Sequence, residues 1–143
     1  YFSFKLAEKG AAVIAADLQT GYLDFIEKTA QRMNLQHKIT TKLVTSNSAH
    51  LAREEVDGIL MVHVYHHIEN RVDYFKEVCK QLASGGQLLI LETPPTRCPD
   101  APPPSHFRLT QDQIRQELKE AGFQHFEANT PIIECQVVYF VTK

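Results

Sequence analysis

Residues 11–17 read AAVIAAD, a run of six apolar residues that ends in an acid. A strand with no polar member is typical of a position buried on both faces, as in a parallel sheet. Residues 56–62 (VDGILMV) and 88–91 (LLIL) have a similar composition. The sequence therefore predicts buried parallel strands in all three places.

Segments with helical spacing separate these strands. Apolar side chains recur three and four residues apart in four segments, and another segment is rich in β-branched residues. The predicted helices cover residues 1–10, 20–34, 72–82 and 110–121, and the additional predicted strand covers residues 37–44. Because strands separated by helices need crossover connections, we expect a mostly parallel sheet with helices on both faces.

The C-terminal region differs from this alternation. Two further predicted strands, residues 123–128 and 136–142, are joined by a short connection that contains Pro131. A short connection fits an antiparallel pair. The predicted fold class is therefore α/β, a doubly wound and mostly parallel sheet with helices on both faces and a C-terminal antiparallel strand pair. The length fits one domain, residues 1–143.

The composition narrows the classes of partner. A net charge of −2 provides no basic field for holding nucleic acid, so no nucleic-acid partner is expected. No stretch approaches the ~20 apolar residues that span a bilayer, so no membrane partner is expected. The cysteines Cys79, Cys98 and Cys135 are widely spaced and form no metal-binding pair or disulfide framework, which fits reduced thiols in a cytoplasmic protein.

Several short motifs follow one another in an order that covers nearly the whole chain. They are VIAAD at residues 13–17, NS at 47–48, YHHI at 65–68, LASGGQLLI at 82–90 and LKEAGF at 118–123. In order and spacing the chain resembles the class I S-adenosylmethionine-dependent methyltransferases, a family of Rossmann-like domains. The first strand of that family and its Gly-x-Gly-x-Gly loop have no counterpart here, so we expect an N-terminally incomplete domain.

The resemblance implies S-adenosylmethionine as the cofactor. Asp17 corresponds to the acid at the end of a strand that binds the ribose hydroxyls, because a carboxylate accepts two hydrogen bonds from a diol. Leu18 corresponds to the apolar residue against the adenine face, and Asn47 and Ser48 to the pair at the adenine edge. Asp17 as a surface acid and Asn47 as an ordinary turn former are the alternatives.

The end of the strand of residues 56–62 is the second predicted part of the site. Ligands of open α/β sheets bind at the carboxyl ends of strands, so we expect cofactor contacts from Met61, Val62 and His63. His66 is the candidate catalytic residue, because histidine changes its charge near neutral pH. Methyl transfer is an in-line displacement, and a general base assists it when the acceptor carries a proton that must leave.

Other residues near this strand have more than one interpretation. Each histidine is equally compatible with packing, and His67 is expected to pack against the next helix. Glu92 ends another strand and is either an acid at the ligand side or a solvated one. A metal site from His63, His66 and His67 is conceivable, but no nearby Cys or carboxylate completes it, so no metal is predicted. The proline-rich residues 93–105 either line the acceptor pocket or form a surface connection.

The leading prediction is an S-adenosylmethionine-dependent methyltransferase that acts on a small-molecule acceptor. The first alternative is a non-catalytic methyltransferase-like interaction domain. The second is a nicotinamide-dependent oxidoreductase, which also places an acid after its second strand, but the short length and the terminal antiparallel pair disfavour it. The sequence indicates neither the identity of the acceptor nor the oligomeric state.

Overall fold

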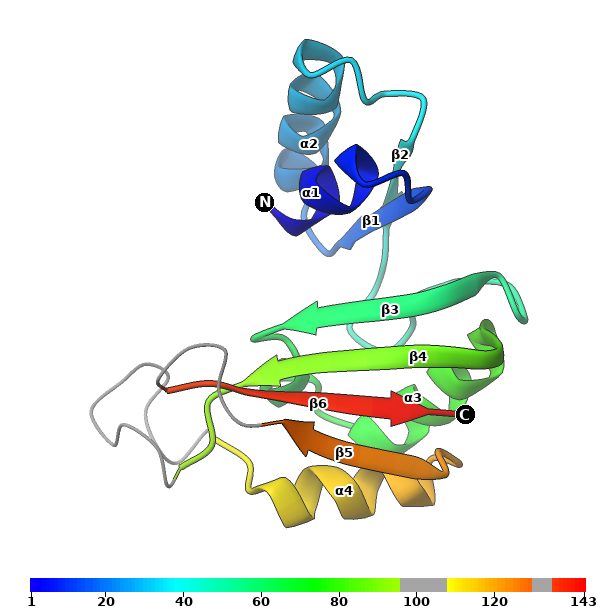
Figure 1. The fold of residues 1–143 in the computed structure, drawn as a ribbon, viewed down its shortest axis with the longest axis vertical. Coiled ribbons are helices and arrows are strands. Elements are labelled where there is room, and N and C mark those ends of the chain that lie inside the picture. The colour runs from blue at the N-terminus through cyan, green and yellow to red at the C-terminus, as the bar shows by residue number, and fades with distance from the viewer. Residues whose placement is uncertain (96–107, 130–134) are drawn as a thin grey trace. The chain divides into compact units, whose positions relative to one another are not determined.

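The computed structural model describes residues 1–95, 108–129 and 135–143. The chain divides into two compact units, unit 1 (Tyr1–His50) and unit 2 (Leu51–Lys143) (Figure 1). Most of the proline-rich loop predicted at residues 93–105 lies outside the described residues. That both units form one methyltransferase domain stays a prediction.

Unit 1 packs two helices against a two-stranded parallel sheet. Its elements are α1 (Phe2–Glu8), β1 (Val13–Asp17), α2 (Thr20–Arg32) and β2 (Ile39–Leu43). The strands pair from Val13 opposite Ile39 to Asp17 opposite Leu43, so their carboxyl ends lie together. Its core consists mainly of small and branched side chains: Ala7, Ala15, Ala30, Leu35 and Ile39, with Phe4, Val13 and Ile26 packed against them.

Unit 2 contains a four-stranded mixed sheet in the order β3-β4-β6-β5. Its elements are β3 (Val56–Val62), the 3-10 turn η1 (Tyr65–His67), α3 (Arg71–Gln81), β4 (Leu82–Glu92), α4 (Gln111–Glu120), β5 (His125–Asn129) and β6 (Val137–Thr142). β3 and β4 are parallel, and β6 is antiparallel to both of its neighbours. The carboxyl ends of β3 and β4 therefore meet at one edge.

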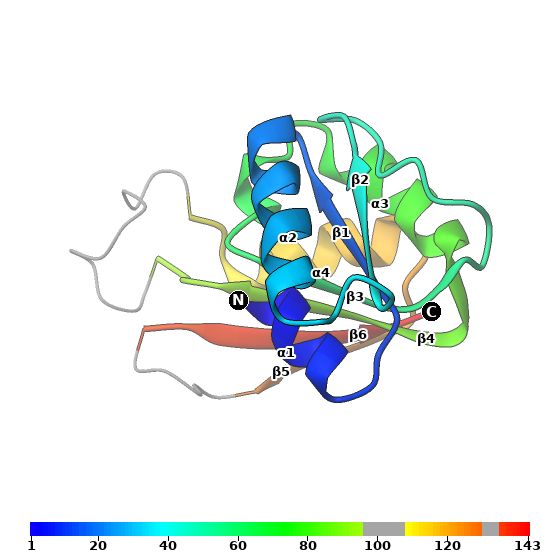
Figure 2. The same cartoon turned by 90° about the horizontal axis from the view of Figure 1, so that it is seen from above.

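The core of unit 2 lies between the sheet and two helices. α3 and α4 lie on the same side of the sheet (Figure 2), where the apolar faces of the strands meet them. Thr110 begins α4 with a capping box, in which its hydroxyl accepts from the Gln113 N–H at 3.2 Å and the Gln113 side chain accepts from the Thr110 N–H at 2.8 Å. The most deeply buried large side chains of this core are Tyr65, Phe75, Leu82, Leu88, Ile90, Ile114, Leu118, Tyr139 and Val141.

The connection from α3 into β4 requires glycine at one position. A Cβ on Gly86 would lie 2.9 Å from the Ala83 carbonyl oxygen and 3.1 Å from the Asp57 carbonyl oxygen. Side chains do not approach backbone this closely, so only glycine fits here. Residues 84–86 lie inside β4 as an irregularity, because Val56 pairs with Leu82 while Gly58 pairs with Gln87.

The order of helices and strands, the α/β class and the antiparallel C-terminal pair are confirmed. The prediction that residues 11–16 and 56–62 are buried on both faces is wrong. Ala15 is the only buried residue of β1 and Met61 the only buried residue of β3, while the neighbours Ala16 and Leu60 are exposed. In the described structure each strand is an edge strand with one covered face, so an unbroken apolar run does not establish a central position.

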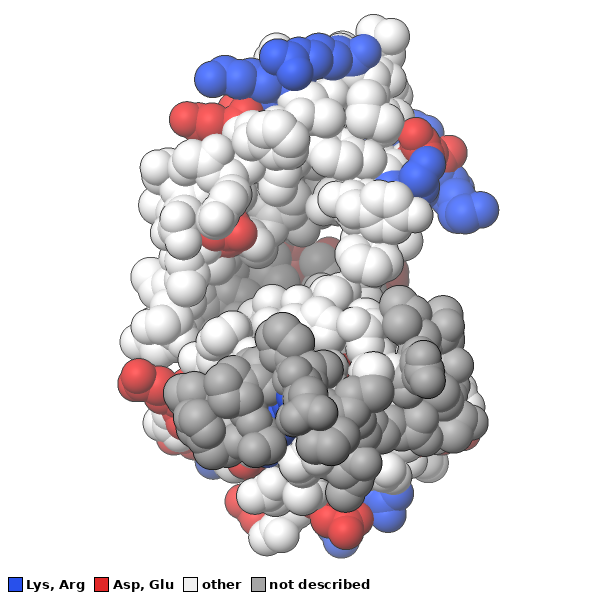
Figure 3. All heavy atoms as spheres, turned by 90° about the vertical axis from the view of Figure 1, so that its left-hand side faces the viewer, with Lys and Arg blue, Asp and Glu red and all other residues white. Residues whose placement is uncertain are grey.

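Surface charge and the state of the cysteines are two further features of the fold. On the described part of the face in Figure 3, basic and acidic side chains lie in small groups among uncharged residues. None of the described helices has both the length and the apolar composition of a membrane span. Cys79 is a free, buried thiol, whereas Cys135 is disulfide-bonded, so the expectation of three reduced cysteines is wrong for Cys135.

Candidate functional site

Asp17 lies at the carboxyl end of the unit 1 sheet. The Val44 N–H donates to its main-chain oxygen at 3.1 Å, which joins the ends of β1 and β2. The Gln19 N–H donates to Asp17 Oδ1 at 2.9 Å and holds the carboxylate at the strand end. Within the described residues Oδ2 has no hydrogen-bond partner, so it is available to a ligand. Leu18, beside it, is 58% exposed and presents an apolar surface.

A tight turn follows β2 at the same end of the sheet. The Thr45 hydroxyl donates to Asn47 Oδ1 at 2.7 Å, and the His50 N–H donates to Ser48 Oγ at 3.0 Å. Thr45 and Ser48 also form an isolated antiparallel bridge. The Asn47 oxygen predicted to meet the adenine amine therefore already accepts one hydrogen bond, which leaves its second lone pair and its NH₂ group for a ligand.

At the end of β3 the chain turns sharply. Met61 is buried in the core of unit 2, whereas Val62 and His63 are partly exposed. His63 has φ 54°, a left-handed conformation that is uncommon for a residue with a side chain, and its N–H donates to the Leu91 carbonyl at 2.9 Å. Such strain is held by the surrounding structure and is frequent at functional sites.

Glu92 ends β4 beside this turn and binds His66. The carboxylate is 7% exposed and the imidazole 5%, and His66 Nδ1 lies 2.9 Å and 3.1 Å from the two carboxylate oxygens. A carboxylate only accepts, so Nδ1 must carry the hydrogen and Nε2 of the neutral ring keeps its lone pair. Of the two predicted interpretations of Glu92, the solvated acid is excluded, because the side chain is buried.

His63 also approaches Glu92. Its Nδ1 lies 3.9 Å from Glu92 Oε2, beyond hydrogen-bond distance, and is buried with no hydrogen-bond partner among the described residues. Its Nε2 lies 2.9 Å from the amide nitrogen of Gln136, and the Gln136 side-chain oxygen is likewise buried with no partner in the described part of the chain. Unsatisfied buried polar atoms of this kind are rare in folded proteins and point to a ligand or water nearby.

A separate network fixes η1, the segment that carries His66. Tyr65 is fully buried and donates to Glu117 Oε2 at 2.7 Å, while Arg71 donates to both Glu117 oxygens at 2.8 Å and to the Ile68 carbonyl at 2.9 Å. Burial raises the pKa of Tyr65, and its hydrogen bond to Glu117 raises it further. Burial alone would raise the pKa of Glu117, but the hydrogen bonds from Arg71 and Tyr65 outweigh it and lower that pKa.

The structure distributes the predicted site residues over both units. Asp17, Leu18, Asn47 and Ser48 belong to unit 1, and Met61, Val62, His63 and His66 belong to unit 2. His67 does not pack in the core as expected; it is exposed, with its ring centroid 4.0 Å from that of His66. The sequence left Glu92 undecided and missed Gln136. Among the described residues no three His, Cys, Asp or Glu side chains are grouped to hold a metal ion.

Comparisons with known proteins agree with this fold. Residues 1–90 match the family described as methyltransferase domain. No curated protein matches the sequence. A SAM-dependent methyltransferase from Aquifex aeolicus superposes with a TM-score of 0.83 and 20% identity, over 100% of this chain and 74% of that one.

Two further solved structures extend the comparison. A SAM-dependent methyltransferase from Mesorhizobium loti has a TM-score of 0.77 and 17% identity, over 100% of this chain and 86% of that one. A putative O-methyltransferase from Nostoc punctiforme has a TM-score of 0.75 and 16% identity, over 94% of this chain but only 45% of its own. At such identities the likeness shows the fold, while the family match extends over more than half of the residues. The chain belongs to the methyltransferase-domain family.

Proposed function

We propose that this protein transfers a methyl group from S-adenosylmethionine to a small-molecule acceptor, with His66 as the general base. The observation that carries the proposal is the buried His66–Glu92 pair at the carboxyl ends of the parallel strands β3 and β4. Open α/β sheets bind their ligands at this edge. A general base needs a free lone pair within hydrogen-bond reach of the acceptor proton, and the bond from Nδ1 to Glu92 leaves that lone pair on Nε2.

S-adenosylmethionine is the cofactor of the methyltransferases that share this fold. When bound, it supplies a methyl group carried on a positively charged sulfur. The residues of unit 1 fit such a group: Asp17 Oδ2 is available to a ribose hydroxyl, Leu18 offers apolar surface to a flat ring, and the Asn47 amide can donate to a ring nitrogen. Ser48 supports the same turn through its hydrogen bond with His50. Met61, Val62 and His63 stay predicted cofactor contacts.

In the proposed reaction His66 removes the proton of the acceptor. Nε2 takes the proton while Nδ1–H remains bonded to Glu92, so the imidazolium that forms faces a carboxylate at 2.9 Å. An ionised partner makes this hydrogen bond stronger as the ring becomes charged. Glu92 thus has two functions: it sets the tautomer and stabilises the charged ring. The dependence on a base applies to acceptors whose proton must leave, such as hydroxyl groups.

A small-molecule acceptor is supported by charge. The net charge of −2 leaves no general attraction for a nucleic acid. A small acceptor needs only a local cavity and a correctly oriented base.

The experiment combines cofactor binding with an acceptor screen. Calorimetry with S-adenosylhomocysteine and with NAD comes first, followed by detection of S-adenosylhomocysteine released in the presence of S-adenosylmethionine and a panel of small phenols, alcohols, amines and thiols. We expect S-adenosylhomocysteine to bind, NAD not to bind, and at least one acceptor to be methylated. Binding of NAD alone would favour the oxidoreductase, and binding of neither compound would favour the non-catalytic interaction domain, which has lost cofactor binding.

His66→Gln and its neighbour His67→Gln form a matched pair for the role of the base. We expect His66→Gln to lower kcat for a hydroxyl acceptor by about 10²- to 10⁴-fold, the usual contribution of a general base. His67 is exposed, so His67→Gln should leave kcat unchanged, and both variants should bind S-adenosylhomocysteine as the unmodified protein does. Equal rates for the two variants would remove His66 from the mechanism.

A further inference from the structure

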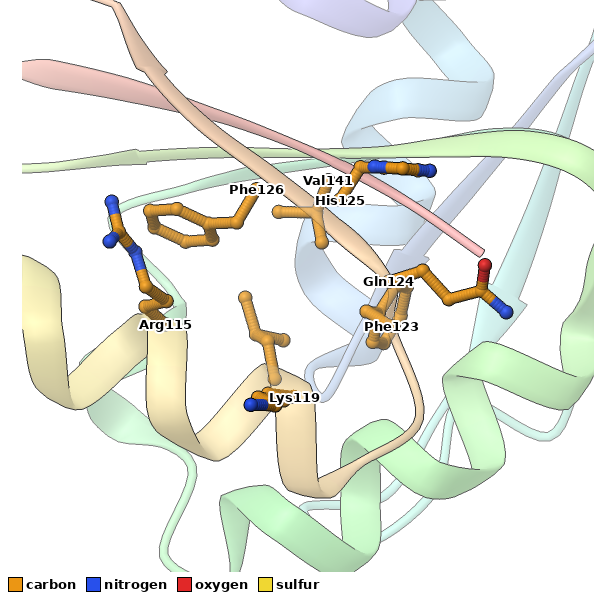
Figure 4. A pocket seen from close by; sticks show the side chains of 8 residues that line it. Arg115, Lys119, Phe123, Gln124, His125, Phe126 and Val141 are labelled. Carbon is orange, nitrogen blue, oxygen red and sulfur yellow. The ribbon is translucent and has the colours of Figure 1, made fainter.

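A cavity lies in unit 2, at the edge of the sheet opposite β3. It is formed between α4 and the edge strand β5, has a volume of about 310 Å³, and is shown in Figure 4. Ligand-binding pockets start at about this size. β6 separates β5 from β4, so this cavity is not part of the His66–Glu92 site.

The floor of the cavity is apolar. Leu118, Phe123 and Val141 line it and are each at most 4% exposed, because they also belong to the core of unit 2. The partly buried ring of Phe126 forms one wall. An alkyl or aromatic group placed here would contact the Phe126 ring and the small exposed parts of these buried side chains.

The rim carries cations. Arg115 and Lys119 lie on successive turns of α4 and both line the cavity. Arg115 extends toward Phe126 (Figure 4), and its guanidinium lies 5.1 Å from the centre of the Phe126 ring. His125 is a further lining residue, and no lining residue is acidic. Neither Arg115 nor Lys119 forms an ion pair or hydrogen bond with any other described residue, although like charges four residues apart in a helix repel each other.

The acids of the same helix form no described ion pair with these two cations. Glu117 is bound to Arg71 and Tyr65, Glu120 accepts a hydrogen bond from Gln116, and Asp112 has no described partner. The cavity thus combines an apolar floor with two cations at its rim that have no described ion-pair partner. A ligand complementary to this arrangement has an apolar body and a negatively charged head.

We propose that the cavity binds a small amphipathic carboxylate, with the apolar chain on the Leu118–Phe123–Val141 floor and the carboxylate between Arg115 and Lys119. Arginine is the side chain best suited to a carboxylate, because its fork of N–H groups matches the two oxygens. The cation–π contact with Phe126 holds the guanidinium at the rim. This inference is independent of the proposed methyl transfer.

The test is a titration of the ¹⁵N-labelled protein with octanoate, followed by NMR. Octanoate should cause saturable shifts confined to α4, residues 123–126 and β6. Octan-1-ol, which has the same chain without the charge, should bind at least about tenfold more weakly, as expected for the loss of a charge-assisted hydrogen bond. Failure of octanoate to saturate, equal affinity for octanol, or shifts outside this region would overturn the proposal.

Two variants distinguish a specific binding site from general attraction between charges. Arg115→Gln/Lys119→Gln should weaken octanoate binding by about tenfold or more. Lys28→Gln removes one positive charge from an exposed residue of α2 that has no described ion pair, and should leave the affinity unchanged. Arg115 and Lys119 are both exposed, so the spectrum should remain that of a folded protein. Equal weakening in Lys28→Gln would show that the binding is non-specific and would reject the site.

Discussion

Two groups of polar residues at strand ends differ in how they are held. In the Asp17 cluster (Asp17, Leu18, Thr45, Asn47 and Ser48) the side-chain hydrogen bonds join residues two to five positions apart in exposed turns. In the Glu92 cluster (His63, His66, Glu92 and Gln136) they join residues 26 and 73 positions apart, and the Glu92–His66 pair is buried. The first cluster depends on local chain geometry, and the second on the tertiary fold.

This difference predicts whether a substitution affects only ligand binding or also the neighbouring residues. A residue of the Asp17 cluster has water as a substitute partner, so its loss should affect mainly the ligand. The buried Glu92–His66 pair of the Glu92 cluster has no such substitute, so the loss of either side chain leaves its partner unsatisfied.

The largest effect is expected for Glu92→Gln. The substituted amide can donate to His66 Nδ1, which would move the ring hydrogen to Nε2 and abolish the lone pair that acts as the base. We expect kcat to fall by about 10²- to 10⁴-fold, the range seen when the partner of a catalytic histidine stops fixing its tautomer. The measurement is the initial rate at saturating S-adenosylmethionine, with cofactor affinity determined by calorimetry.

Glu69→Gln is the control for Glu92→Gln, because Glu69 is exposed, close to η1 and without a described partner. It should leave both quantities unchanged. An unchanged kcat in Glu92→Gln, together with weaker cofactor binding, would contradict the proposed role. It would mean that Glu92 contributes to cofactor binding and not to the action of the base.

The second prediction concerns the network beneath His66. Glu117→Gln removes an ion pair whose members are about one-fifth exposed. We expect a loss of about 2 kcal/mol in the free energy of unfolding, less than for a fully buried pair. Because the folded-state pKa of Glu117 lies below its ordinary value of 4.5, the stabilisation is complete above that pH and is lost as the pH falls through the folded-state pKa.

Urea unfolding between about pH 7 and pH 3 measures this effect. The difference between Glu117→Gln and the unmodified protein should shrink toward the acid end. Glu127→Gln, an exposed glutamate on β5 with no described partner, should change stability little at either pH. A difference that does not depend on pH would mean that Glu117 stabilises the protein by packing and not by its charge.

The same contrast explains what the sequence predicts and what it leaves open. The sequence singles out Asp17 and the turn at Asn47 and Ser48 because the signals are local: an acid after an apolar run, and turn formers in succession. His66 was singled out, but its pairing with Glu92 was not, since nothing in either segment specifies contact across 26 residues. Gln136 carries no local signal at all.

The fold shows the same limit. Alternation of apolar periods predicted the order of helices and strands, and a short connection predicted that β5 and β6 are antiparallel. The position of β6 between β4 and β5 was not predicted. The alternation of apolar residues along a strand indicates which side chains share a face, but it does not indicate which strand is the neighbour. The burial of residues 11–16 and 56–62 was overestimated for the same reason, since an apolar strand can lie at an edge.

The third prediction tests the Asp17 cluster through its ligand. Asp17→Asn retains an oxygen that accepts from the Gln19 N–H but removes the negative charge offered to the ribose. We expect about tenfold weaker binding of S-adenosylhomocysteine, with stability and the saturated rate nearly unchanged, because one charge-assisted hydrogen bond becomes neutral. Asp24→Asn, an exposed acid on α2, is the matched control and should have no effect. A fall in the saturated rate would contradict a role confined to cofactor binding.

The smallest effect is expected for Thr45→Val, which keeps the shape of the side chain and removes the hydroxyl that donates to Asn47. The turn is exposed and water replaces the lost partner, so the free energy of unfolding should change by no more than about 0.5 kcal/mol. The Asn47 side chain should become freer, which predicts a modest loss of cofactor affinity, about two- to threefold, as one side chain is ordered again on binding. Thermal unfolding and calorimetry measure the two quantities. A large loss of stability would show that this turn depends on the tertiary fold as the Glu92 cluster does, and the distinction between the two clusters would then fail.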